Sequence, residues 1–115
     1  MSRQEATRIF RGKDRLNCAQ AITRAFRPET TAAEIKTLKK AGFGKAENGE
    51  CGAYYAARLL LADDERVAAL KREFQRRCGS VNCRRIRRDK LVSCEECVAV
   101  AAGCLERLLP EQDDA

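Results

Sequence analysis

A chain of 115 residues can bury one sizeable hydrophobic core but not two, so its length excludes a two-domain protein. Charged residues make up 35% of the sequence and aromatic residues only 5%, which is typical of a helical protein with an aliphatic core. The net charge of +6 would suit an anionic partner, whereas the lack of a signal peptide or of any run of about eighteen apolar residues excludes a membrane span and predicts a cytoplasmic protein.

The first part of the chain predicts three helices. Apolar residues recur at helical spacing over residues 3–11 and again from about Asp14 to Arg27, and Pro28 ends that second helix. Thr31 and Glu34 then form the capping-box pattern that starts a third helix, with Ile35, Leu38 and Ala41 as its apolar residues.

A glycine-rich stretch separates this third helix from the most apolar segment of the chain. Gly42 to Gly44, and Asn48 with Gly49, predict an irregular loop, because Gly and Asn tolerate left-handed backbone angles. The run from Cys51 to Leu61 follows directly and is nearly all apolar. It is therefore the candidate for a central buried helix.

Two further helices are predicted before position 90. Acidic residues at 63–65 suit the positive end of a helix dipole, and the helix that they start should end at Gly79. Asn82 can then cap a short basic helix that begins at Cys83.

The last predicted helix begins at Cys94, because Ser93 and Glu96 form a second capping-box pattern. The predicted apolar face of this helix consists of Cys97, Val100, Ala101, Cys104, Leu105 and Leu108. No segment shows a convincing strand pattern. We therefore predict an all-α fold, a single compact bundle of five to seven short helices, as one cysteine-rich domain over residues 1–109 with a frayed tail at 110–115.

Seven cysteines and no histidine are the most unusual feature of the composition. Cys51, Cys83 and Cys94 fall at predicted helix starts, where free backbone N–H groups and the helix dipole favour a thiolate. Cys97 lies one turn beyond Cys94 and shares its face. The arginines expected to lower these pKa values further are Arg76, Arg77, Arg84 and Arg85.

Cysteines cluster as core residues, as metal ligands or as redox-active thiols, and permanent disulfides are uncommon in a reducing cytoplasm. The spacing Cys78-x4-Cys83-x10-Cys94-x2-Cys97 is close to a four-cysteine zinc pattern, and it disfavours four independent core residues. A zinc site of this kind leaves Cys18 and Cys51 without a role. Cys104 has no cysteine neighbour on its apolar helix face and is interpreted as a core residue.

Four motifs occur in an order that is informative. They are Asn17-Cys18-Ala19-Gln20-Ala21, Cys51-Gly52-Ala53 after a Gly-Phe-Gly loop, Gly79-Ser80-Val81-Asn82-Cys83-Arg84, and Cys97 with Val100-Ala101-Ala102. Together they resemble the C-GCAxxG-C-C family, whose members are described as redox-active, over about residues 9–109. By position, the resemblance implies that Cys18, Cys51, Cys83 and Cys97 are the principal thiolates, suited to electron transfer or to a bound cluster.

The chain departs from the family pattern around Cys51. Glu50, Gly52 and Tyr55 stand where the motif has a glycine, an alanine and a second glycine, so we expect fewer positions of close backbone approach there. Cys78, Cys94 and Cys104 are additional to the family's cysteines and are candidates for extra ligands or resolving thiols.

We therefore expect a cytoplasmic redox-active protein whose thiolates transfer electrons, bind an iron–sulfur cluster or exchange dithiol for disulfide with a redox partner protein. The candidate metal ligands are Cys18, Cys51, Cys78, Cys83, Cys94 and Cys97. The alternative is a structural zinc site with four cysteine ligands and a basic face for nucleic acid or protein. A cluster could also be shared between two copies of the chain, as a homo-oligomer.

The missing histidine excludes Cys-His zinc sites and a histidine-activated cysteine nucleophile. Lys and Arg far outnumber acidic residues in the segment 71–90, but it holds one aromatic residue, Phe74, and no recognised nucleic-acid-binding motif. We favour a solvated helix face there over a nucleic-acid interface.

Overall fold

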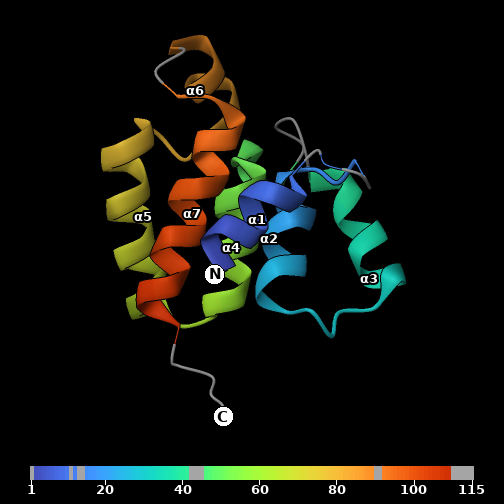
Figure 1. Ribbon diagram of the computed structural model, residues 1–115. Coiled ribbons are helices and arrows are strands. Elements are labelled where there is room, and N and C mark those ends of the chain that lie inside the picture. The colour runs from blue at the N-terminus through green and yellow to red at the C-terminus, as the bar shows by residue number, and fades with distance from the viewer. Residues whose placement is uncertain (1, 11, 13–14, 42–45, 90–91, 110–115) are drawn as a thin grey trace.

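The computed structural model describes residues 2–10, 12, 15–41, 46–89 and 92–109, and these form a bundle of helices (Figure 1). The α-helices are α1 (Ser2–Ile9), α2 (Cys18–Phe26), α3 (Ala32–Thr37), α4 (Gly52–Leu61), α5 (Asp64–Cys78), α6 (Cys83–Asp89) and α7 (Cys94–Leu108), with short 3-10 helices η1 (Leu38–Ala41) and η2 (Glu47–Gly49). No strand occurs among the described residues. The predicted all-α class with five to seven helices is confirmed.

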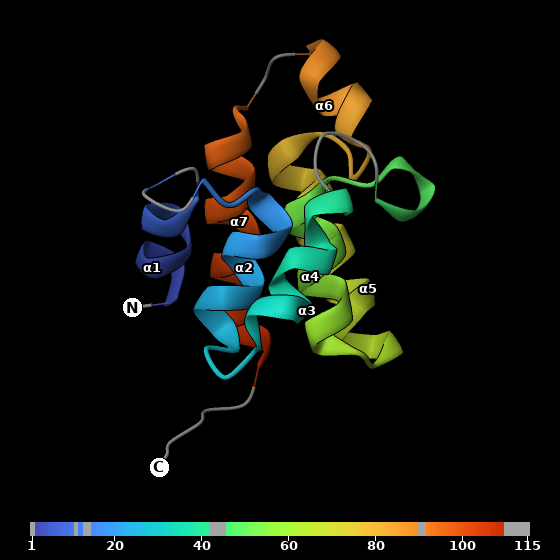
Figure 2. The same ribbon diagram turned by 90° about the vertical axis from the view of Figure 1, so that its right-hand side faces the viewer.

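Helix α4 lies at the centre of the bundle, as its apolar sequence predicts, and packs against α2, α5 and α7. Its inner face is built from small residues such as Ala53 and Ala57, which are fully buried and let the neighbouring helices approach closely. Helix α1 covers α2 and α7, while α3 lies to one side of α2 (Figure 2).

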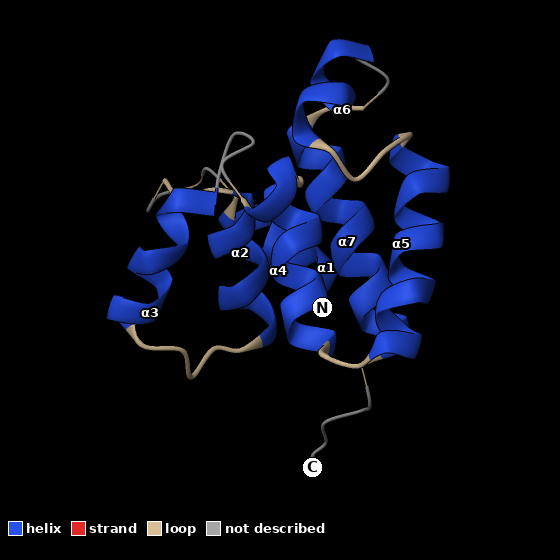
Figure 3. Ribbon diagram, turned by 180° about the vertical axis from the view of Figure 1, so that it is seen from behind, coloured by secondary structure: helices blue, strands red, loops and turns tan. Residues whose placement is uncertain are grey.

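The direction of the helices decides what gathers at each end of the bundle. Helices α2, α4 and α7 all begin at the same end, and α5 runs the opposite way and finishes there (Figure 1). The short helix α6 stands on that end (Figure 3). Helix starts and the end of α5 therefore share one region of the molecule.

The predicted capping motifs fix most of these boundaries. Thr31 with Glu34 and Ser93 with Glu96 form reciprocal capping boxes, and the helices begin where those motifs predict. At the start of α6, the Asn82 side chain accepts a hydrogen bond from the Arg85 N–H at 3.0 Å. Helix α5 is capped at its start by Asp63 and ends at Gly79, which has a φ of 90°.

The predicted start of the second helix at Asp14 is wrong. Helix α2 begins at Cys18, because Asn17 and Gln20 form a capping box there and Arg15 has a left-handed φ of 55°. Leu16 instead pairs with Phe10 in an isolated bridge.

The ends of two other helices also differ from the sequence prediction. Helix α1 ends at Ile9, and α3 ends at Thr37, after which the chain tightens into η1. Asn48 and Gly49 adopt the predicted left-handed angles, whereas the predicted loop at 42–44 and the tail at 110–115 lie outside the described residues.

The interior of α7 also differs in detail from its predicted apolar face. Val98 and Ala102 are fully buried, while Val100 and Leu108, which the sequence predicts inside, are only partly buried. In the part of the chain that the structure describes, no helix is both long and apolar enough to cross a membrane.

Candidate thiol site

Six of the seven cysteines lie at the end of the bundle where the helix starts meet. Cys18 is the first residue of α2, Cys51 is the N-cap of α4, and Cys78 is the last residue of α5. Cys83 begins α6, and Cys94 and Cys97 occupy the first turn of α7. These are the six residues given above as candidate metal ligands, and the fold brings them into one region.

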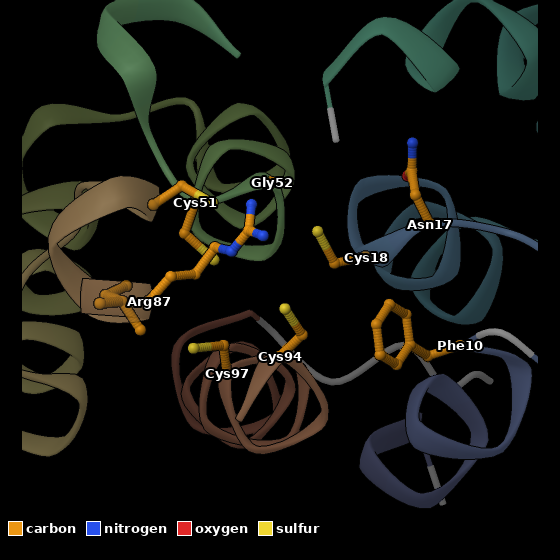
Figure 4. Close-up of a pocket in the computed structure, with 10 residues that line it drawn as sticks. Phe10, Asn17, Cys18, Cys51, Gly52, Arg87, Cys94 and Cys97 are labelled. Carbon is orange, nitrogen blue, oxygen red and sulfur yellow. The ribbon is translucent and has the colours of Figure 1, made fainter. Parts of the chain in front are cut away.

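A small cavity of about 30 Å³ lies among them. Its lining residues are Phe10, Asn17, Cys18, Cys51, Gly52, Cys83, Ile86, Arg87, Cys94 and Cys97 (Figure 4). Cys18 and Cys94 are partly exposed, whereas the other three cysteines of the lining are buried. Cys78 lies outside the lining but close enough to Cys97, which belongs to the lining, to raise the pKa of that thiol.

The thiols of Cys18, Cys51, Cys97 and Cys78 follow one another in that order, and contacts between neighbours shift the pKa values of Cys18, Cys51 and Cys97. Cys51 occupies an inner place in this row, between Cys18 and Cys97. A sulfur that accepts two S–H hydrogen bonds is stabilised as a thiolate.

These contacts shift the three pKa values in opposite directions. Hydrogen bonds from Cys18 and then Cys97 hold the pKa of Cys51 well below its usual value, against the effect of burial. The contact with Cys51 raises the pKa of both Cys18 and Cys97. The next largest cause is burial for Cys18 and the contact with Cys78 for Cys97. Of these three thiols, Cys51 is therefore the one whose pKa is lowered, and it lies between two neighbours whose pKa values are raised.

The helix start contributes less to this shift than the sequence suggests. Cys51 forms no capping hydrogen bond of regular geometry, although the N–H groups of Tyr54 and Ala53 lie close enough to lower its pKa slightly. Most of the lowering of the Cys51 pKa comes from the Cys18 and Cys97 thiols. No local sequence pattern could place these two thiols beside Cys51.

The expectation that Cys83 has a lowered pKa is wrong. Burial raises the pKa of Cys83, the charge at Cys51 raises it further, and a weaker opposite effect comes from Arg87. Arg87 was not among the predicted arginines. Its position four residues after Cys83, on the same face of α6, was the available signal.

Gly52 is a second residue whose importance the sequence concealed. A Cβ atom at this position would lie 2.5 Å from the Cys18 Sγ and 2.8 Å from the Ala41 carbonyl oxygen. Only glycine allows α4 to start against α2 in this way. The expectation of fewer close backbone approaches around Cys51 is therefore corrected at this position.

Two backbone contacts hold Cys51 in place from the other side. Its N–H donates to the Val81 carbonyl at 2.7 Å, and Glu50 pairs with Asn82 in an isolated antiparallel bridge. Glu50 also forms an ion pair of 2.9 Å with Arg58 of α4. The segment before α6 and the start of α4 are thus fixed to each other.

Asn17 and Gln20, which flank Cys18 in its motif, have structural roles. The Asn17 side chain caps α2 and donates to the Leu38 and Lys39 carbonyls, each at 3.2 Å. The buried Gln20 amide donates to the Ile35 carbonyl at 2.9 Å. Together they tie α2 to α3 and η1.

Cys104 lies apart from the cavity, as its isolated position in the sequence suggests. It is buried in α7 and accepts a hydrogen bond from Arg107 at 3.6 Å. At a rise of about 1.5 Å per residue, it is roughly 15 Å along the helix from Cys94.

The cysteines have the donor chemistry that zinc and iron–sulfur clusters require, since both bind sets of thiolates. Within the described residues, no three His, Cys, Asp or Glu side chains are arranged so that they could hold a metal ion. Comparisons with family models, with curated proteins and with solved structures found no match to this chain.

Proposed function

We propose that this chain is a redox-active thiol protein of the reducing cytoplasm, in which Cys51 and Cys18 cycle between a thiolate–thiol pair and a disulfide. The observation that carries the proposal is that Cys18 and Cys51 line one cavity, with the Cys18 sulfur lying against Gly52, the residue after Cys51. The lowered pKa of Cys51 favours it as the nucleophile, and Cys18 is the partner beside it.

The cycle balances as a two-electron step. Cys51 supplies a thiolate and Cys18 a thiol; forming the S–S bond releases two electrons and the Cys18 proton to an oxidant of the hydroperoxide or disulfide class. A dithiol partner protein or a small thiol compound then reduces the bond and restores both groups.

Cys18 is a better disulfide partner for Cys51 than Cys97 is, because Cys18 is more accessible to solvent than Cys97. Cys18 is partly exposed, whereas Cys97 is only 2% exposed and deeper in the bundle. A disulfide between Cys18 and Cys51 can therefore be reached by a reductant. The resemblance of the four motifs to a redox-active family further supports the proposal.

A metal centre is the second candidate, and one observation favours it. Five cysteines line a single cavity, and they come from α2, α6, α7 and the N-cap of α4. Cys18, Cys51, Cys83 and Cys97 would be the ligands of an iron–sulfur cluster or of zinc, with Cys78 and Cys94 as auxiliary ligands, and a cluster shared by two chains would make a homo-oligomer.

The test starts from protein purified without oxygen. Iron, acid-labile sulfide and zinc are measured per chain, and the thiols are then titrated with a mild oxidant and mapped by peptide mass spectrometry. We expect two thiols to be lost together and one disulfide, Cys18–Cys51, in the peptide map.

Cys104→Ser is the matched control, because it also removes a buried cysteine but not one of the cavity. It should form the same disulfide, whereas Cys51→Ser should not. Thiols that stay unreactive in the folded protein would contradict the proposal. Stoichiometric zinc, or iron with equal sulfide, would instead support the metal centre.

A further inference from the structure

We propose that the oxidant of the Cys18–Cys51 pair is a small hydroperoxide, because the space beside Cys51 is about the size of one or two water molecules. The inference rests on the proposed function of these two thiols and adds the class of substrate.

The volume of the cavity is the first argument. A space of about 30 Å³ holds only one or two water-sized molecules, since a single water needs roughly 10–15 Å³ by the same measure. Hydrogen peroxide has two heavy atoms and fits. A glutathione-sized disulfide or a disulfide on a protein surface does not.

The burial of Cys51 is the second argument. Cys51 is 6% exposed, whereas Cys18 and Cys94, which line the same cavity, are partly exposed. Thiol–disulfide exchange requires access for a substituted sulfur and passes through a mixed disulfide, for which the folded protein leaves no space at Cys51. A hydroperoxide delivers its distal oxygen without attaching its remaining part to the protein.

Arg87 supplies the third argument. It belongs to the cavity lining, and its guanidinium group reaches from α6 towards the space beside Cys51 and Cys18 (Figure 4). A guanidinium there can donate hydrogen bonds to the oxygen that leaves when the O–O bond breaks. Phe10 and Ile86 line the same cavity and provide apolar walls.

The reaction balances in two steps. The Cys51 thiolate attacks the distal oxygen of R–O–O–H; an S–O bond forms, the O–O bond breaks, and the alkoxide or hydroxide takes a proton from solvent to leave as alcohol or water. The Cys18 sulfur then attacks the sulfenic acid at Cys51, which forms the disulfide and releases one water. The hydroperoxide gains two electrons and the two thiols lose them.

The experiment compares oxidants of increasing size on the reduced, metal-free wild-type protein. The loss of Cys18 and Cys51 thiols is followed with hydrogen peroxide, tert-butyl hydroperoxide and oxidised glutathione at equal concentration. We expect hydrogen peroxide to react at least tenfold faster than either of the others. In denaturing urea the cavity no longer exists. The ratio of the rate with hydrogen peroxide to the rates with the larger oxidants should then fall to the ratio found for an ordinary cysteine.

Two variants test the role of Arg87. Arg87→Ala should slow the reaction with hydrogen peroxide by about ten- to a hundredfold, on the scale of a lost transition-state donor. Arg84→Ala removes the same charge from the exposed side of α6 and should leave the rate unchanged. An equal loss in both variants would show a general charge effect and overturn the assignment of Arg87.

The outcomes separate the oxidant from the function. If oxidised glutathione or tert-butyl hydroperoxide forms the Cys18–Cys51 disulfide as fast as hydrogen peroxide does, the small-hydroperoxide proposal is overturned while thiol cycling stands. If none of the three oxidants forms this disulfide in the folded protein, both proposals fail.

Discussion

Gly52 lets the start of α4 lie directly against the Cys18 thiol, and this close approach makes a sharp prediction. In Gly52→Ala the new Cβ would lie 2.8 Å from the Ala41 carbonyl oxygen, a backbone atom that cannot turn away. We expect a loss of about 1–3 kcal/mol in the free energy of unfolding, typical of overpacking, together with slower formation of the Cys18–Cys51 disulfide. Urea unfolding and thiol titration measure the two effects.

Gly103→Ala is the matched control for that substitution. Gly103 lies inside α7, and a Cβ there would lie no closer than 3.6 Å to the side chain of Arg3, an ordinary contact. Because alanine favours helix more than glycine, this variant should be stabilised by about 0.5–1 kcal/mol. If both variants were equally destabilised, the close approach at Gly52 would not be the cause.

The shifted pKa values of these thiols should also make the stability depend on pH, with a maximum near the ordinary cysteine pKa of 9. The pKa of Cys51 is lowered on folding, so its contribution is complete above pH 9 and is lost as the pH falls towards its folded value. The pKa values of Cys18 and Cys97 are raised, so their contribution is complete below pH 9 and is lost above it.

Urea midpoints of the reduced, chelator-treated protein between about pH 6 and 10.5 would show this maximum. Cys83 and Cys104, whose pKa values are also raised by burial, should add to the fall above pH 9. Cys51→Ser should flatten the rise below pH 9. A rise that persists unchanged in that variant would mean that another group is responsible.

At the scale of the helices, Asn17 links the start of α2 to η1 and should matter for the position of Cys18. Asn17→Ala removes the cap of α2 and both hydrogen bonds to the Leu38 and Lys39 carbonyls. We expect a cost of about 1–2 kcal/mol in unfolding free energy, and slower disulfide formation at Cys18.

Thr31→Ala is the comparison for this prediction, because Thr31 caps α3 in the same way but lies outside the cavity lining. It should cost about 1 kcal/mol without changing the rate of disulfide formation. An equal change of rate in the two variants would show that the rate follows global stability and not the position of Cys18.

Helix boundaries could be predicted where a capping motif was unambiguous. Three predicted caps are present in the structure: the Thr31–Glu34 box, the Asn82 cap and the Ser93–Glu96 box. The start of α2 was misplaced, because helical periodicity continues back to Leu16 and conceals the capping box at Asn17. Periodicity reports which residues face the core, and a loop residue such as Leu16 can do so without being helical.

For the molecule as a whole, the fold class followed from composition, but the arrangement of the thiols did not. That α2, α4 and α7 begin at one end depends on how loops turn the chain, and no cysteine spacing records it. The contacts of Cys51 with Cys18 and Cys97 join residues far apart in sequence. Local patterns could therefore name the six cysteines but not the one whose pKa these contacts lower.

The link between α2 and α4 predicts how oxidation changes global stability. A disulfide between Cys18 and Cys51 closes a long loop of the unfolded chain, which by chain entropy should stabilise the folded state by about 3–4 kcal/mol. Urea midpoints of oxidised and reduced protein measure this difference. Cys18→Ser treated with the same oxidant should show no increase, and an unchanged midpoint in the wild type would argue against this pairing.

Because Cys104 is buried far from the cavity, its thiol can report the global unfolding of the protein. Its thiol is 1% exposed and lies far along α7 from the cavity, so a bulky alkylating reagent reaches it only when the bundle comes apart. Its labelling rate should therefore follow the population of widely opened molecules, while Cys18 and Cys94 respond to events at the cavity. One chain can thus report its overall unfolding and its local chemistry in a single labelling experiment, with no engineered probe.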